Sequence, residues 1–182
     1  MSYRRFRPLL TAVTALTLAG CAAGSKLSAP LTVVRTVPFA ASAGVTNEVR
    51  EECGLESNFA EHLRSALSSE YEVVVQAERI APTTPGRTLS AKITQILAPG
   101  GGTYSGPKNF TVEGVLRDNG RVVGSFTAMR EVINVPRPSS VAVGPNASNC
   151  GQLLQISKQI SKDIAGWART PTMNTKLGYK PF

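Results

Sequence analysis

The sequence predicts an α+β fold, a two-layer sandwich in which two helices cover one face of a four- or five-stranded antiparallel or mixed sheet. Two segments, 54–69 and 151–168, carry apolar residues at three- and four-residue steps, which is the period of a helix with one buried face. The remaining predicted elements are short β-branched and apolar runs bounded by glycine and proline, which is the pattern of strands and turns. The resulting order, β-α-β-β-β-β-α, favours a sheet with its helices gathered on one side.

The first strand and the first helix open the predicted domain. Residues 31–39, LTVVRTVPF, are rich in β-branched side chains, and Pro38 ends this strand or marks a sheet edge. The helix at 54–69 has a large apolar residue at every fourth position, and the residues before it leave open an earlier start near Thr46. Its apolar stripe is Leu55, Phe59, Leu63 and Leu67.

Four further strands are predicted between the helices. Residues 71–77 are apolar and β-branched, and residues 88–97 alternate between apolar and polar side chains. The alternation places on one face Leu89, Ala91, Ile93, Gln95 and Leu97. Segments 109–117 and 121–135 flank Asp118-Asn119-Gly120, which is typical of a hairpin turn, so we expect these two strands to pair antiparallel.

The last helix is predicted over 151–168, where Ser148 or Asn149 can cap its first turn. Residues 169–182 have no periodicity and contain two prolines, so we expect a loose C-terminal tail. The sequence therefore predicts a single α+β domain over 31–168, which is long enough to bury a hydrophobic core.

The N-terminus has the layout of a secretory signal over residues 1–20. Arg4, Arg5 and Arg7 precede an apolar run, 8–19, that is too short to cross a bilayer. The run ends in Leu18-Ala19-Gly20-Cys21, which resembles the lipobox of bacterial lipoproteins. An ordinary secretory signal cut after Ala23 is the alternative, because small residues also precede that position.

The lipobox resemblance implies that Cys21 is acylated and becomes the first residue of the mature chain. Several acyl chains anchor a protein stably, whereas one chain binds a bilayer only marginally. The residue after the cysteine is alanine and not aspartate, which by analogy with enteric-type sorting implies the outer membrane, with the domain facing the periplasm. Residues 21–30 would then be the lipidated cysteine and a short tether.

Two cysteines remain for the domain, Cys53 and Cys150. Since the periplasm is oxidising, we expect them to form a disulfide, with two buried free thiols as the alternative. With one histidine, His62, and no CxxC or HxxxH spacing, no metal site and no cofactor are predicted.

The charge of the chain excludes one class of partner. The formal net charge is +8 for 182 residues, and it falls to about +5 once the three signal arginines are removed. Basic residues do not form runs with interleaved aromatics, so nucleic acid is not expected as a partner.

The order of elements resembles small envelope domains of the TolB amino-terminal, curli-secretion and penicillin-binding-protein-activator lipoprotein type. The resemblance rests on the lipobox, on LTVVRTVPF, on the helix from Phe59 to Leu67, on YEVVVQA and on the Asp118-Asn119-Gly120 hairpin. It covers most of the mature chain as a pattern, and it carries over no functional residue and no disulfide.

No catalytic residues are predicted. His62 lies beside Glu61 on the first helix without a nucleophile motif, and GxSxG, SxxK and HExxH are absent from the sequence. The glycine-rich segment 99–108 lacks the GK[ST] ending of a phosphate loop. As a loop between strands it is a candidate contact surface, with Tyr104 and Lys108 as its contact residues.

The sequence therefore predicts a lipid-anchored, non-catalytic envelope protein that contacts the membrane through the lipid on Cys21. Its domain would bind another envelope protein through a sheet edge or through the glycine-rich loop. A small-ligand or cell-wall binding module is the alternative, and a hydrolase with an unrecognised site is a third reading.

Overall fold

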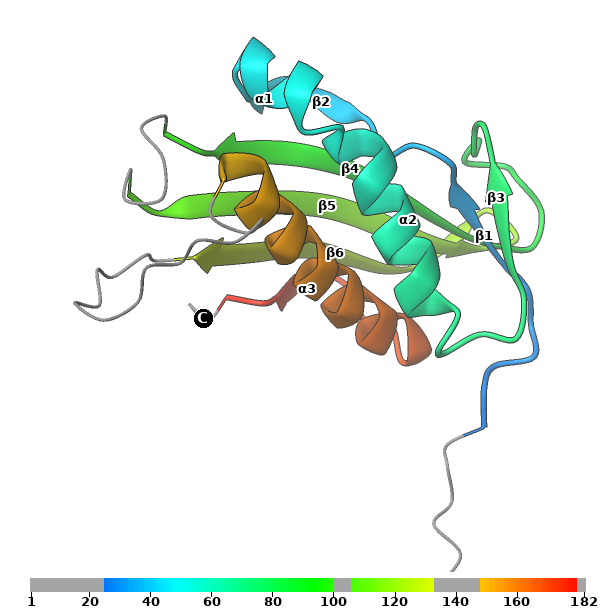
Figure 1. Cartoon of the computed structure of the whole chain (residues 1–182). Helices are drawn as coiled ribbons and strands as arrows, with labels where there is room; N and C mark the ends of the chain where they lie inside the picture. The colour runs from blue at the N-terminus through cyan, green and yellow to red at the C-terminus, as the bar shows by residue number, and fades with distance from the viewer. Residues whose placement is uncertain (1–24, 100–105, 133–147, 180–182) are drawn as a thin grey trace, which may run out of the picture.

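The computed structural model describes residues 25–99, 106–132 and 148–179, in which three helices cover one face of a mixed sheet (Figure 1). This arrangement confirms the predicted α+β two-layer sandwich. The strands are β1 (Leu31–Val34), β2 (Phe39–Gly44), β3 (Val74–Ala77), β4 (Arg87–Leu97), β5 (Lys108–Asp118), β6 (Arg121–Val132) and β7 (Thr175–Leu177). The helices are α1 (Asn47–Glu52), α2 (Leu55–Leu67) and α3 (Asn149–Arg169).

The described strands form one seven-stranded sheet, which is larger than the predicted four or five strands. Its order is β3-β1-β4-β5-β6-β7, and β2 pairs with β4 beside this path. Strands β4, β5 and β6 are antiparallel to their neighbours in this group, whereas β1, β2, β3 and β7 join the sheet through parallel pairs. The sheet is therefore an antiparallel centre with parallel additions at both sides.

The predicted strand 31–39 is divided into β1 and β2. Pro38 lies at the break, where it has no amide hydrogen to give to a ladder. The amide of Val37 instead donates to the carbonyl of Glu56 at 3.0 Å, and the Val37 side chain is buried. The chain thus leaves the sheet, contacts the start of α2 and returns as β2 along another part of β4.

The first helical region consists of two helices separated by Cys53 and Gly54. Thr46 caps α1 by accepting a hydrogen bond from the amide of Val49 at 3.3 Å. Gly54 follows with φ of +52°, a left-handed conformation that glycine adopts without steric strain. The earlier start near Thr46 that the sequence left open is therefore α1, and α2 is the predicted amphipathic helix.

The β5–β6 hairpin forms as predicted, with Asn119 and Gly120 both at positive φ in the turn. One expectation for β4 is wrong. The register with β5 shifts between Ile93 and Gln95, and this bulge reverses the alternation. Ile96 is consequently buried, whereas Leu97 is 46% exposed.

The C-terminal tail is not loose over Thr175–Leu177. These residues form β7, which pairs in parallel with Phe126–Ala128 of β6. Trp167 of α3 donates its indole hydrogen to the hydroxyl of Thr175 at 3.2 Å. The tail is ordered because α3 and β6 supply its partners, which periodicity within residues 169–182 could not show.

Candidate functional site

The N-terminal end of the described chain is fixed to the C-terminal ends of α2 and α3. Lys26 donates to the carbonyl of Ser68 at 2.7 Å, and Leu27 forms a parallel bridge with Tyr71. Arg169 donates to the carbonyl of Ser25 at 3.4 Å. Cys21 lies outside the described residues, but Ser25 is only four positions after it, a reach of about 14 Å when extended.

This arrangement defines two ends of the domain. Helices α2 and α3 lie side by side and begin at the same end, because Cys53 precedes α2 and Cys150 is in the first turn of α3. The N-terminal segment leaves at the opposite end (Figure 1). Since α3 has 21 residues, the two ends are separated by about 30 Å.

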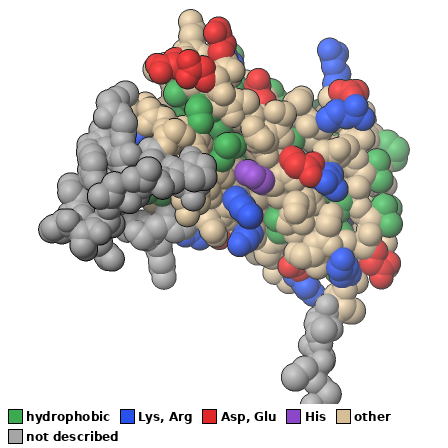
Figure 2. Space-filling model, viewed as in Figure 1, with side chains coloured by type: hydrophobic (Ala, Val, Ile, Leu, Met, Phe, Trp, Pro, Cys, Tyr) green, Lys and Arg blue, Asp and Glu red, His purple; other side chains and the backbone are tan. Residues whose placement is uncertain are grey.

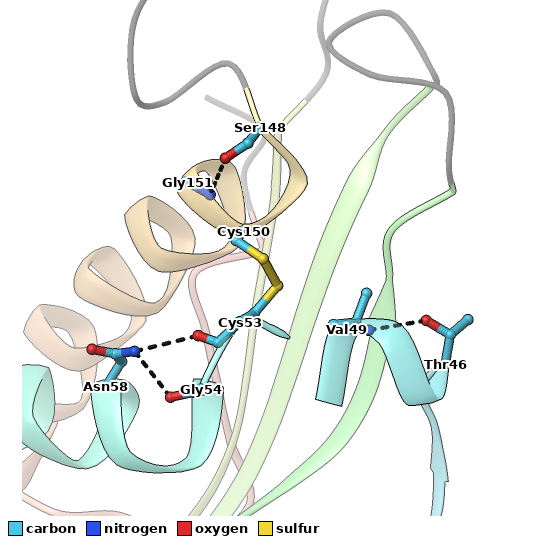
Figure 3. Close-up of a disulfide and its surroundings, with 8 residues drawn as sticks. All are labelled: Thr46, Val49, Cys53, Gly54, Asn58, Ser148, Cys150 and Gly151. Atoms are coloured by element: carbon cyan, nitrogen blue, oxygen red, sulfur yellow. Dashed lines mark hydrogen bonds between the residues drawn. A yellow bond between two sulfur atoms is a disulfide. The ribbon is translucent and has the colours of Figure 1, made fainter. Parts of the chain in front are cut away.

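Cys53 and Cys150 form a disulfide, the pairing that the sequence predicts for an oxidising compartment (Figure 3). The bond joins residues 97 positions apart. The side-chain amide of Asn58 donates to the carbonyls of Cys53 and Gly54, at 3.3 and 3.0 Å, and so holds the turn beside the disulfide. Ser148 caps α3 next to it by accepting from the amide of Gly151 at 3.0 Å.

The expectation that Lys108 contributes to an exposed contact surface is wrong. Its side chain is fully buried, and its ammonium donates to the carbonyls of Pro99 and Gly106 at 3.3 and 3.2 Å. Burial lowers the pKa of Lys108. The lysine therefore joins the two ends of the glycine-rich segment, and Tyr104, the other predicted contact residue, lies outside the described residues.

A groove of about 410 Å³ runs between α2 and α3 on the face turned away from the sheet. Its lining comes from one stripe on each helix at helical spacing. The α2 side and the end of this helix contribute His62, Ser65, Ala66, Ser69 and Glu70, and the α3 side contributes Lys158, Lys162, Ala165 and Gly166. Figure 2 shows the histidine on this face with basic side chains beside it.

His62 is held at the groove by a hydrogen bond across the two helices. Its Nδ1 lies 2.7 Å from the hydroxyl of Ser157, and that hydroxyl donates to the carbonyl of Leu154 at 2.8 Å. The hydroxyl has one hydrogen, so it accepts from Nδ1–H, and Nε2 is left to the groove. Burial and the positive charge of Lys158 lower the pKa of His62, so the neutral imidazole is favoured.

Strand β3 forms one edge of the sheet and pairs with β1 among the described residues. Val73, just before this strand, and Val75 within it are 48% and 46% exposed. The carbonyl of Val73 accepts from Leu31 of β1, and the carbonyl of Ala77 accepts from Arg35 just after β1. Since alternate residues of a strand face opposite sides, the main-chain groups of Val74 and Gln76 point away from β1. An exposed edge with apolar side chains is a template for a further strand.

The described residues contain neither a metal-ligating cluster nor a membrane-spanning helix. No group of three or more His, Cys, Asp or Glu side chains there could hold a metal ion. No helix within residues 25–99, 106–132 and 148–179 is long and apolar enough to cross a membrane.

Sequence reasoning missed the groove, although part of its signal was present. The lining residues of each helix recur at three- and four-residue steps, at 62, 65, 66 and 69 on one side and at 158, 162 and 166 on the other. Taken separately, these are the solvent-facing stripes of two amphipathic helices. Only the neighbouring positions of α2 and α3 turn the two stripes into the walls of one groove.

No family model matches the sequence, and no curated protein matches it. Several solved structures are similar to this chain. A PelC dodecamer from Paraburkholderia phytofirmans is 16% identical with a TM-score of 0.42, covering 76% of this chain and 92% of that chain. A DUF330 protein from Xanthomonas campestris is 12% identical with a TM-score of 0.49, covering 81% and 87% of the two chains. A minor lipoprotein from Acinetobacter baumannii is 12% identical with a TM-score of 0.41, covering 81% and 97%.

Proposed function

We propose that this protein is a lipid-anchored envelope protein that binds another protein without catalysis. Cys21 carries the lipid, the domain faces the periplasm from the outer membrane, and β3 provides the binding edge. The observation that carries the proposal is the fixed segment from Ser25 to Leu27, four residues after Cys21. A lipid on Cys21 would keep the C-terminal ends of α2 and α3 at the bilayer.

The contacts at this end support a defined orientation on the membrane. Lys26 donates to the carbonyl of Ser68, the C-cap residue of α2. Arg169 pairs with Glu70 at 2.6 Å and also donates to the carbonyl of Ser25. Basic side chains at helix C-termini interact favourably with the helix dipole. Because these contacts fix Ser25 and Lys26, the anchor would hold the domain by one end, with the disulfide away from the bilayer.

A membrane-fractionation experiment tests the anchor. In cells of the native host, Cys21→Ala is expected to move the protein from carbonate-washed membranes into the soluble fraction, because the variant has no thiol to acylate. Ala22→Ser is the matched control, since it keeps the thiol and a small neighbouring residue, and it should stay with the membranes. Retention of the Cys21→Ala protein in washed membranes would contradict the anchor.

The binding edge is tested by site-specific photocrosslinking in cells. A crosslinking side chain at Val75 is expected to give one dominant protein adduct, because the edge of β3 is exposed there. The same side chain at Arg121, the exposed first residue of β6, should not give that adduct. Val73→Lys should lower the yield at Val75, because a charge on an edge opposes strand addition.

Two results would overturn the binding edge. One is the same set of adducts from positions 75 and 121, and the other is an adduct yield at Val75 that Val73→Lys leaves unchanged.

The second candidate function is a small-ligand binding module, which the groove between α2 and α3 favours.

A further inference from the structure

The groove between α2 and α3 carries uncompensated positive charge. Lys158 and Lys162 lie one helical turn apart on α3 and are exposed. In the described part of the chain, neither lysine takes part in an ion pair or a side-chain hydrogen bond. Their ammonium groups are therefore available to a ligand in the groove.

The acidic side chains near the groove are already paired. Glu70, which lines it, pairs with Arg169 at 2.6 Å. Glu61, the neighbour of His62, accepts two hydrogen bonds from Arg64. The lysine charges consequently remain unbalanced at the groove, and the potential there favours an anion.

The opposite wall adds neutral polar groups and open space. Ser65 and His62 line the α2 side of the groove, and the Nδ1 of His62 is already bonded to Ser157. A Cβ atom built on Gly166 would meet no other atom within 4 Å, so the glycine leaves room on the α3 side. A volume of about 410 Å³ lies within the usual range of small-molecule sites.

We propose that the groove between α2 and α3 binds the phosphate group of a small ligand. Lysine binds phosphate as a compact point charge. A phosphate group offers three strong acceptor oxygens and more than one negative charge, which is enough for two ammonium groups and one hydroxyl. Lys158 and Lys162 bind the phosphate oxygens, and Ser65 donates from the α2 side. The site is separate from the β3 edge, so it does not depend on the proposed protein partner.

A phosphate titration followed by NMR tests the site. The probe is inorganic phosphate, added to the full chain carrying Cys21→Ala, with sodium chloride of equal ionic strength as the reference. The expected result is a saturable shift of the backbone amide signals of His62, Ser65 and Gly166. Lys158→Gln with Lys162→Gln is expected to weaken the binding about tenfold or more.

Two further variants separate a built groove from general surface charge. The control is a double variant, Arg79→Gln with Arg121→Gln, which removes the same amount of charge. Both arginines are exposed and form no ion pair among the described residues. This variant should leave the dissociation constant for phosphate within about twofold of the unaltered value. Gly166→Leu fills the groove and keeps both lysines, and it should weaken binding as much as the lysine variant. Equal weakening by the arginine pair, or unchanged binding in Gly166→Leu, would overturn the proposal.

A vesicle-binding experiment shows whether the phosphate belongs to a lipid headgroup or to a soluble compound. The same chain and its Gly166→Leu variant are sedimented with phosphatidylglycerol vesicles and with phosphatidylcholine vesicles. Binding to phosphatidylglycerol that Gly166→Leu abolishes assigns the groove to a lipid headgroup, whereas phosphate binding without vesicle binding assigns it to a soluble phosphate compound. Absence of both kinds of binding would overturn the proposal and would leave the Cys21 and Val75 experiments unaffected.

Discussion

Replacing Cys53 and Cys150 together by alanine is expected to lower the free energy of unfolding by about 4–5 kcal/mol. The two residues are 97 positions apart, and in the chain-entropy model a loop of about 100 residues contributes about 4.7 kcal/mol by restricting the unfolded chain. For a chain of this size the expected fall in Tm is about 10–20 °C. Urea denaturation and a thermal melt of both proteins measure the two quantities.

A reducing agent provides the matched control for this disulfide. Dithiothreitol should lower the Tm of the native protein toward that of the double alanine variant, and it should not change the Tm of the variant itself. The prediction would be contradicted if the free energy of unfolding of the double variant were less than about 1 kcal/mol below that of the native protein. Removing a native disulfide from a small secreted domain typically costs 2–5 kcal/mol.

The disulfide also has a consequence for the groove. It joins the N-terminal ends of α2 and α3, and the hydrogen bond between His62 and Ser157 joins the same helices further along. Two separate connections along one pair of helices limit how far these helices can slide or separate. The spacing between the two polar stripes is thereby kept constant, which a site built across both helices requires.

Local patterns in the sequence predicted the elements that depend on few partners. The hairpin at Asn119-Gly120 needs two consecutive residues at positive φ, and helix α2 needs one apolar stripe. Both signals lie within short stretches of sequence. The fold class followed because these elements alternate in an order that few architectures accommodate.

Non-local partners explain what the sequence could not predict. Strand β7 has three residues and exists because β6 and Trp167 lie beside it. The bulge after Ile93 reverses the faces of β4 without a glycine or proline to mark it. Lys108 was expected at the surface because it belongs to the glycine-rich loop, but its ammonium donates to the carbonyls of Pro99 and Gly106 inside the protein.

The candidate sites also divide into those that local sequence could predict and those that depend on tertiary neighbours. Cys21, Cys53 and Cys150 could be singled out because residue type and compartment carry the argument. The groove required the knowledge that α2 and α3 are neighbours that begin at the same end. That relation is a property of the tertiary structure, and the polar stripes of two separate helices do not contain it.

Truncation of Trp167 to alanine is expected to destabilise the protein by about 3–5 kcal/mol, the usual cost of removing a buried tryptophan. The indole ring packs edge-on against Phe126 with centroids 4.9 Å apart, and the side chain is 7% exposed. It also lies over Gly124, where a Cβ atom would be 2.7 Å from the ring. Neighbouring atoms therefore enclose the ring closely, and its removal leaves a cavity.

Two neighbouring variants show which part of this loss is packing. Thr175→Val removes the hydroxyl that accepts from the indole and also bonds to Thr172. This change should cost about 1–2 kcal/mol, the net value of the hydrogen bonds lost. Gly166→Ala adds a methyl group in open space on the same helix, and it should stabilise by about 0.5–1 kcal/mol through helix propensity. Urea denaturation gives the three free energies, and hydrogen exchange at Thr175–Leu177 reports on β7. A Trp167→Ala protein that loses no more stability than Thr175→Val would show that the indole contributes only its hydrogen bond. In that case the packing of α3 on β6 would not be what orders the C-terminal strand.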